Sequence, residues 1–243
     1  MDKHMSSKNN TSAIIVGALL CVGLISLGYF ISHGLITMRV LDRTVTVKGL
    51  SEREVPANIA IWPIKFNEVS NDLGALYSTI QRKNKQIVKF LQENGISEEE
   101  ISVSIPATMD RQAQEYRDAG QDQYRYFGSS TITVYSTNVK LVRQSMDKIF
   151  ELGKNGIAIT GQNYETRTEF LFKGLNDLKP DMIEEATRNA REVAEKFATD
   201  SGSKLGKIRK AYQGQFSIVD RDSNTPHIRK IRVVSTVTYF LTD

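Results

Sequence analysis

Side chains that commonly carry out chemistry are sparse in this chain of 243 residues. Its three histidines are His4, His33 and His227, and its one cysteine, Cys21, lies within an apolar run. Zinc sites need histidine or cysteine ligands at set spacings, and a cysteine nucleophile needs a basic partner. Neither pattern occurs, and no glycine-rich phosphate-binding motif occurs. We therefore expect no catalytic residue, no metal and no cofactor.

His227 is the one histidine outside the N-terminal region, and it follows Pro226 in a polar loop. A Ser-His-Asp triad could form around it, although the sequence lacks the Gly-x-Ser-x-Gly turn of many serine hydrolases. A solvated loop histidine is the simpler interpretation. The run Glu98-Glu99-Glu100 could suggest a metal site, but consecutive carboxylates do not converge on one point. A solvated turn is the simpler interpretation of that run.

Two clusters of basic residues offer a second kind of site. They are Lys204, Lys207, Arg209 and Lys210, and Arg229, Lys230 and Arg232. If the last two strands of the chain pair, the clusters come close together and could bind an anionic envelope polymer or lipid headgroups. Ordinary solvated strand faces are the alternative interpretation.

A third candidate is the aromatic group Tyr116, Tyr124, Tyr126 and Phe127, which stands among arginines. Aromatic and basic residues together are typical of surfaces that bind single-stranded nucleic acid. The net charge of +4 is too small and too dispersed for that function, so we expect no nucleic-acid partner. A cross-strand aromatic ladder fits better, and an interface in a homo-oligomer is the functional alternative.

An apolar segment at residues 13–36 precedes the basic clusters, the aromatic group and His227. It carries no charge between Ala13 and Ile31. Its large apolar side chains favour insertion into a bilayer by about 3 to 6 kcal/mol in total. A helix of this length spans the roughly 30 Å of a bilayer core. The segment is therefore predicted to be a transmembrane helix, and the membrane is the first expected partner.

The apolar run is long for a secretory signal, and it ends in Ile31-Ser32-His33-Gly34, where no Ala-x-Ala cleavage site appears. We therefore expect an uncleaved signal-anchor behind a short tail, residues 1–12. The basic residues on its two sides nearly balance, but a short tail and a long C-terminal body favour a body outside the cytoplasm. Nucleic acid is rarely met there.

Residues 39–243 are predicted to form one globular region, since 40% of the chain is apolar and 25% is charged. Period-two patterns predict strands at residues 43–48, 57–68, 101–105, 124–136, 157–172, 207–219 and 229–241. Residues 118–122 would be the tip of a long hairpin. The expected buried face of residues 57–68 is Ala60, Trp62, Ile64 and Phe66. That of residues 157–172 is Tyr164, Thr166, Thr168, Phe170 and Phe172.

Three helices are expected between these strands. The first is capped by residues 70–72, ends at Gly95 and buries Leu73, Tyr77, Ile80, Ile87 and Leu91. The second is capped by Asn138, ends at Gly153 and buries Val139, Val142, Met146, Ile149 and Phe150. The third has Pro180 in its first turn, ends at Gly202 and buries Ile183, Ala186, Ala190, Val193, Ala194 and Phe197. The fold class is α+β, with mainly antiparallel sheets packed by three helices.

Several short motifs stand in a familiar order along this region. They are Val45-Thr46-Val47-Lys48-Gly49, Val55-Pro56-Ala57, Ala60, Gly95-Ile96, Ala186, Ala190-Arg191, Ala194, Phe197-Ala198, Gly202 and Leu205-Gly206. In this order they resemble the SIMPL domain family of bacterial envelope proteins, over residues 43–243. The alanines would give a helix a smooth face for close packing on a sheet, so the late motif specifies packing and not chemistry.

The resemblance implies an α+β fold, an extracytoplasmic location, and links to envelope integrity, oxidative-stress tolerance or protein interaction. Some relatives assemble into rings, and the family brings no established catalytic residues. The leading hypothesis is therefore a membrane-anchored, non-catalytic protein that works through other envelope proteins or self-assembly as a homo-oligomer. The alternatives are a hydrolase that acts on an envelope substrate through His227 or carboxylates, and a binding module for anionic polymer or lipid.

Overall fold

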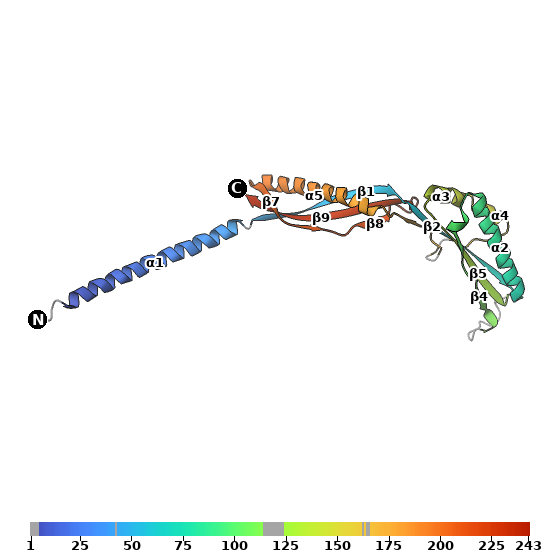
Figure 1. Cartoon of the computed structure of the whole chain (residues 1–243), viewed down its shortest axis with the longest axis horizontal. Coiled ribbons are helices and arrows are strands. Elements are labelled where there is room, and N and C mark those ends of the chain that lie inside the picture. The colour runs from blue at the N-terminus through green and yellow to red at the C-terminus, as the bar shows by residue number, and fades with distance from the viewer. Residues whose placement is uncertain (1–4, 42, 114–123, 162, 164–165) are drawn as a thin grey trace. The chain divides into compact units, whose positions relative to one another are not determined.

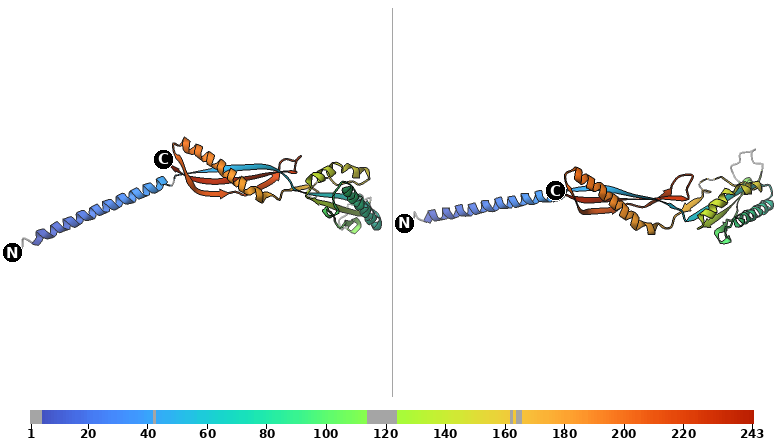
Figure 2. Two further views of the ribbon diagram at one scale, coloured as in Figure 1. Left: turned by 45° about the horizontal axis from the view of Figure 1, so that its top comes forward. Right: turned by 90° about the horizontal axis from the view of Figure 1, so that it is seen from above.

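The computed structural model describes residues 5–41, 43–113, 124–161, 163 and 166–243 (Figures 1 and 2). The described residues confirm the α+β class, with two antiparallel sheets and helices that pack on them. The predicted hairpin tip at residues 118–122 lies outside the described residues.

The first helix, α1 (Met5–Leu41), contains the whole apolar segment expected at residues 13–36. Its stretch Ile14–Gly34 is long and apolar enough to cross a membrane, and none of that stretch is buried. Every large apolar side chain from Ile14 to Ile31 is more than half exposed. Length and composition are consistent with a membrane anchor or with a signal sequence.

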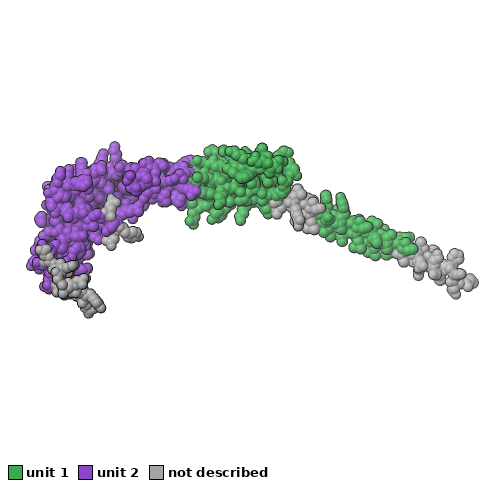
Figure 3. Space-filling model, turned by 180° about the vertical axis from the view of Figure 1, so that it is seen from behind, with its two compact units in different colours: residues 1–51, 181–215, 233–243 green, residues 52–180, 216–232 purple. Residues whose placement is uncertain are grey.

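The chain divides into two compact units (Figure 3). The first comprises residues 1–51, 181–215 and 233–243, and the second comprises residues 52–180 and 216–232. The predicted globular region, residues 39–243, therefore contributes to both units.

One sheet has the strand order β1 (Thr44–Pro56), β9 (Ile228–Thr242) and β7 (Lys204–Gln213), and β8 (Ser217–Asp220) also pairs with β9. The predicted strand 43–48 thus continues to Pro56, and the predicted strand 207–219 is interrupted near Gly214. In the first unit, helix α5 (Leu175–Asp200) packs on one face of this sheet. The buried cluster there comprises Val47, Ala190, Ala194, Val237 and Tyr239.

Gly49 marks the closest approach of β1 to α5. A Cβ atom at this position would lie 1.9 Å from the carbonyl oxygen of Ala186 and 2.4 Å from the amide nitrogen of Ala190. Only a glycine opposite small residues permits backbones to come so near. The predicted alanine face of α5 is confirmed, and Gly202 ends the helix with φ +68°.

Two expectations for α5 are wrong. Val193 and Phe197 are exposed, because the buried stripe follows Met182, Ala186, Ala190, Ala194 and Ala198 at a spacing of four residues. Pro180 lies inside the helix, which begins one turn earlier than predicted. Because proline has no amide hydrogen, the helix lacks the hydrogen bond that residue 180 would otherwise donate to the carbonyl oxygen of Asn176.

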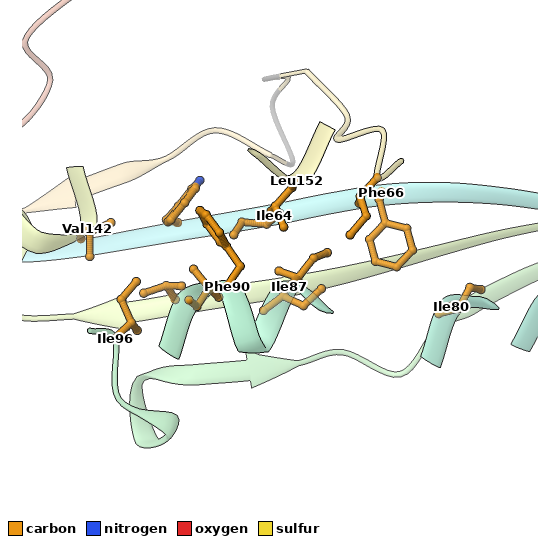
Figure 4. Close-up of a cluster of buried hydrophobic side chains, with 14 of the residues drawn as sticks. Ile64, Phe66, Ile80, Ile87, Phe90, Ile96, Val142 and Leu152 are labelled. Atoms are coloured by element: carbon orange, nitrogen blue, oxygen red, sulfur yellow. The ribbon is translucent and has the colours of Figure 1, made fainter. Parts of the chain in front are cut away.

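The second sheet has the strand order β3 (Ile101–Val103), β5 (Tyr126–Ser136), β2 (Ile59–Ser70) and β6 (Glu169–Leu171), and β4 (Ala107–Asp110) pairs with β5. Helices α2 (Leu73–Glu93), α3 (Val139–Asp147) and α4 (Phe150–Lys154) contribute to its core. Figure 4 shows α2 side chains such as Ile87 gathered with Ile64 and Phe66 of β2. Two short 3-10 turns, Glu98–Glu100 and Arg111–Ala113, connect these elements.

The predicted caps of α2 are confirmed, but part of its predicted buried face is wrong. Asp72 Oδ1 accepts a hydrogen bond from the Ala75 amide at 2.6 Å, and Gly95 follows the helix with φ +89°. Leu73 and Tyr77 are exposed, whereas Leu76 is buried. In the first turns of α2, the buried stripe therefore passes through Leu76 and not through Tyr77. Adjacent helical residues are about 100° apart around the axis, so the predicted face was rotated by that angle.

The region between Asn138 and Phe172 departs most from expectation. Asn138 caps α3 as predicted, but the helix stops at Asp147 and a separate turn, α4, follows. Phe150 is therefore 77% exposed, and Gly156, with φ +77°, is the left-handed residue in place of Gly153. Among the described residues of the range 157–172, only Glu169–Leu171 forms a strand, and Ile159 makes an isolated bridge to Phe66.

A side-chain turn accounts for the missing strand. Thr166 Oγ1 donates to the Gly161 carbonyl oxygen at 2.8 Å and accepts from the Asn163 amide at 2.8 Å. These bonds compete with strand pairing. Thr166, Thr168 and Phe170 are nevertheless buried as predicted, whereas Tyr164 and Glu165 lie outside the described residues.

Replacing Gly49 should test the close packing of β1 on α5. We expect Gly49→Ala to lower the free energy of unfolding by about 1 to 3 kcal/mol, because the methyl group must displace helix backbone. Gly153→Ala is the matched control, since a Cβ atom there meets nothing within 4 Å. Urea unfolding of the full chain in neutral detergent measures both variants. Equal stabilities would contradict the packing described here.

Candidate functional site

The first basic cluster lies on β7 and pairs with the C-terminal segment of β9, whereas the second cluster lies on β9 itself and pairs with β8. Lys204 stands opposite Thr242 and Lys210 opposite Thr238, whereas residues 229–232 stand opposite β8. The hypothesis that the clusters meet required the strand containing residues 207–210 to pair with residues 229–232. Because the register is different, the strand pairing does not bring the seven residues into one patch.

The first cluster follows β7, which lies at an edge of its sheet. The Arg209 guanidinium lies 5.6 Å from the centre of the Phe240 ring, and Lys204 Nζ donates to the Asp243 carbonyl oxygen at 3.3 Å. Lys207 lines a cavity of about 630 Å³ together with Ile208 and Phe240. Lysines on an edge strand also discourage pairing with another chain, which is sufficient reason for their presence.

Two cations of the second cluster have carboxylate partners. Arg229 pairs with Asp220, and Lys230 Nζ lies 2.7 Å from Glu52 Oε1. Arg232 is exposed on the same strand. A cation that is already paired attracts a further anion less strongly, so this arrangement gives the polymer-binding hypothesis little support.

The structure separates the predicted aromatic group. Tyr126 is half-buried and packs against the core, and the Arg125 guanidinium lies 4.8 Å from the centre of its ring. Phe127 is the next residue of β5 and therefore projects from the opposite face. Tyr124 is exposed, and Tyr116 lies outside the described residues.

Phe127 stands in a row of apolar side chains across three strands. Its register partners are Val69 on β2 and Met109 on β4, and both of these are exposed. The Arg111 guanidinium lies 5.7 Å from the centre of the Phe127 ring. Directly opposed side chains stabilise a sheet, so the row is a cross-strand ladder, and Val69 and Met109 leave part of its apolar surface exposed.

His227 is held by an arginine and an aromatic ring. Its Nε2 atom lies 3.0 Å from Arg143 Nη1, and because a guanidinium can only donate, Nε2 accepts that hydrogen bond. The Phe170 ring meets the imidazole edge-on, with 6.1 Å between the ring centres. Burial lowers the pKa of His227, and the charges of Arg143 and Arg221 lower it further.

The carboxylates predicted as alternative catalytic or metal groups stabilise local turns. Asp222 Oδ1 accepts hydrogen bonds from the amides of Asn224 and Thr225, both at 2.8 Å. Hydrogen bonds from Thr225 and Arg221 lower the pKa of Asp222 well below its ordinary value. Glu100 accepts from the amide of Ser97 at 3.0 Å and closes the turn Glu98–Glu100. Among the described residues, no cluster of histidine, cysteine and carboxylate groups could hold a metal ion.

Sequence reasoning missed a charged pocket in the second unit. Arg167, Thr168, Asp220 and Arg229 line this pocket, which has a volume of about 430 Å³. Arg229 belonged to a predicted cluster. Arg167 and Thr168 were expected only as neighbouring positions of the predicted strand at residues 157–172. Their approach to β8 depends on the tertiary fold, and no local spacing signals it.

Comparison with protein families gives one match. Residues 45–238 match the family described as SIMPL, Protein of unknown function (DUF541). No curated protein matches the chain. The matched region includes the core of the second sheet, the alanine face of α5 and, apart from Tyr239, the buried cluster of the first sheet.

Changing Arg143 should move the titration of His227. Its pKa lies below the ordinary 6.5, so the unfolded chain binds more protons there than the folded chain when the pH lies between the two values. This histidine therefore makes folding more favourable as the pH rises through that window. We expect Arg143→Gln to raise the pKa of His227 but to leave it below 6.5, because burial remains.

The measurement is an NMR titration of the histidine ring signals, with His227→Gln to assign the signal. An unchanged pKa of His227 in Arg143→Gln would contradict an electrostatic effect of the arginine on the imidazole.

Proposed function

The chain belongs to the SIMPL family, and we propose that it is a membrane-anchored, non-catalytic envelope protein that works by contacting other proteins, including copies of itself. The observation that carries this proposal is the uncovered apolar stretch Ile14–Gly34 of α1. The family has no known function, so the proposal depends on this chain's own features.

The apolar stretch supports an anchor because water solvates such a surface poorly. Burying apolar area is favourable by about 25 cal/mol per Å², and no part of this stretch is buried within the protein. A bilayer is the surrounding that fits a helix apolar on all sides. The length of the apolar run and the absence of an Ala-x-Ala site after Ile31 favour an uncleaved anchor over a removed signal. The proposed place of the body is outside the cytoplasm, the location that the family resemblance implies.

The uncovered face of the second sheet supports the proposal that this protein works by contacting other proteins. Val69, Phe127 and Met109 form their apolar row there, next to Arg111. Aromatic and arginine side chains contribute strongly to protein interfaces. The first proposed partner is a second copy of the chain. Other envelope proteins are the next proposed partners.

The hydrolase alternative has less support. A catalytic histidine acts as a base towards a nucleophile and is oriented by an acceptor on its other nitrogen. The Nε2 atom of His227 instead accepts from Arg143, and Asp222 is engaged with its own turn. The carboxylates of Glu98–Glu100 also belong to a turn.

Assembly through the Phe127 face can be tested with one charged substitution. We expect Phe127→Glu to shift the full chain in neutral detergent towards the monomer, because the carboxylate would have to be desolvated in the interface. Phe150→Glu is the control, since Phe150 is an exposed phenylalanine that lies in α4, away from the β5 row. Light scattering coupled to size-exclusion chromatography measures the mass. A monomeric parent protein would contradict self-assembly, and an unchanged oligomer in Phe127→Glu would exclude this face.

The side of the membrane can be tested with protease. We expect the body to be digested in cells whose outer barrier is opened while the inner membrane stays intact, because the proposal places residues 39–243 outside the cytoplasm. A cytoplasmic marker protein serves as the control for intact membranes. Digestion of the body only after lysis would contradict the proposed location.

A further inference from the structure

The charged pocket of the second unit lies beside β6, between residues 167–171 and the paired strands β8 and β9. Its lining includes Arg167, Thr168, Asp220 and Arg229, and its volume is about 430 Å³. Volumes of about 300 to 1,000 Å³ are typical of small-molecule sites. This pocket takes no part in the proposed contact function.

Two guanidinium groups share one carboxylate in this pocket. Arg229 Nη1 donates to Asp220 Oδ1, and Arg167 Nη2 donates to Asp220 Oδ2. One negative charge balances only one of the two positive charges at this point. The pKa of Arg229 is lowered by burial and by the charge of Arg167, which indicates that its own charge is incompletely compensated. Glu169 also lines the pocket, but it is exposed to water.

Two hydrogen-bonding groups of the pocket have no partner among the described residues. They are the hydroxyl of Thr168 and the Nε atom of Arg229. Thr168 is only 6% exposed, and the Arg229 side chain is 14% exposed. A buried polar atom without a partner costs about 1 to 3 kcal/mol, so a native structure usually supplies one. Both groups are donors, and both oxygens of Asp220 are already engaged.

We propose that this pocket binds a small oxyanion, a carboxylate or a phosphate group, which accepts hydrogen bonds from Arg229 Nε and the Thr168 hydroxyl. Arg167 supplies the second positive charge, and its exposed side chain can turn from Asp220 towards the ligand. A guanidinium matches the planar geometry of such anions and forms charge-assisted hydrogen bonds with them. A cation is disfavoured because it would meet two guanidinium groups and no free oxygen of Asp220.

The test is calorimetric titration of the full chain in neutral detergent at constant ionic strength. The probes are inorganic phosphate and succinate, one for each oxyanion. We expect saturable binding of at least one probe, and the probe that binds more tightly identifies the oxyanion class. Thr168→Val should weaken binding about tenfold, because it removes one hydrogen bond to a charged group at nearly constant volume.

Thr168→Val also separates binding from folding. The hydroxyl has no partner to lose, so replacing it with a methyl group should leave the thermal unfolding midpoint unchanged or raised. Arg232→Gln is the matched control, because it removes one exposed positive charge from the strand that carries Arg229. The control should bind as the parent does. Absence of saturable binding by both probes, or equal affinities in Thr168→Val and Arg232→Gln, would overturn the proposal.

Discussion

A helix that leaves its apolar surface uncovered constrains everything that follows it in the chain. The stretch Ile14–Gly34 has no protein surface against which to bury its side chains. Only an apolar surrounding removes that surface from water, and a bilayer provides one of matching thickness. We propose that this surrounding holds the body at a membrane, where it meets partners that are also confined to the envelope. Confinement raises their effective concentration, so weak contacts between small surfaces can suffice.

The sheets of the body are covered unevenly by its helices. On β1, Val47, Gly49 and Ser51 are buried, while Thr46, Lys48 and Leu50 alternate with them and are exposed. The second sheet buries Ile64 and Phe66 beneath its helices and leaves Val69 exposed. Antiparallel sheets commonly have one packed and one solvated face, so the exposed face can change without loss of the core. The oxyanion pocket adds a separate, polar means of recognition.

The sequence predicts those parts of the fold that depend on local spacing. The period-two face of β2, the caps at Asp72 and Asn138, and the left-handed Gly95 and Gly202 are all local features, and each is confirmed. The spacing of Val193 and Phe197 suggested burial as strongly as that of the alanines. Their exposure follows from Gly49, because a helix so close to a strand can present only small residues to it. That distance is a tertiary quantity, and no pattern within α5 reveals it.

The candidate site was less predictable for the same reason. The basic clusters were recognised, but whether they meet depends on the register of β9, which pairs with β7 and β8 along different segments. His227 was correctly singled out as the only histidine in the body, yet its partner Arg143 lies 84 residues away. Thr168 was expected to be buried, but its missing hydrogen-bond partner is visible only once the surrounding atoms are placed.

Membrane retention of the intact chain tests the central claim most directly. Cell membranes are washed with alkaline carbonate, and the mass of the retained protein is measured to establish whether residues 1–36 are still present. We predict that the uncleaved chain stays in the membrane pellet and is released only by detergent. Recovery of the full-length chain, with its apolar segment intact, in the soluble fraction without detergent would contradict membrane anchoring.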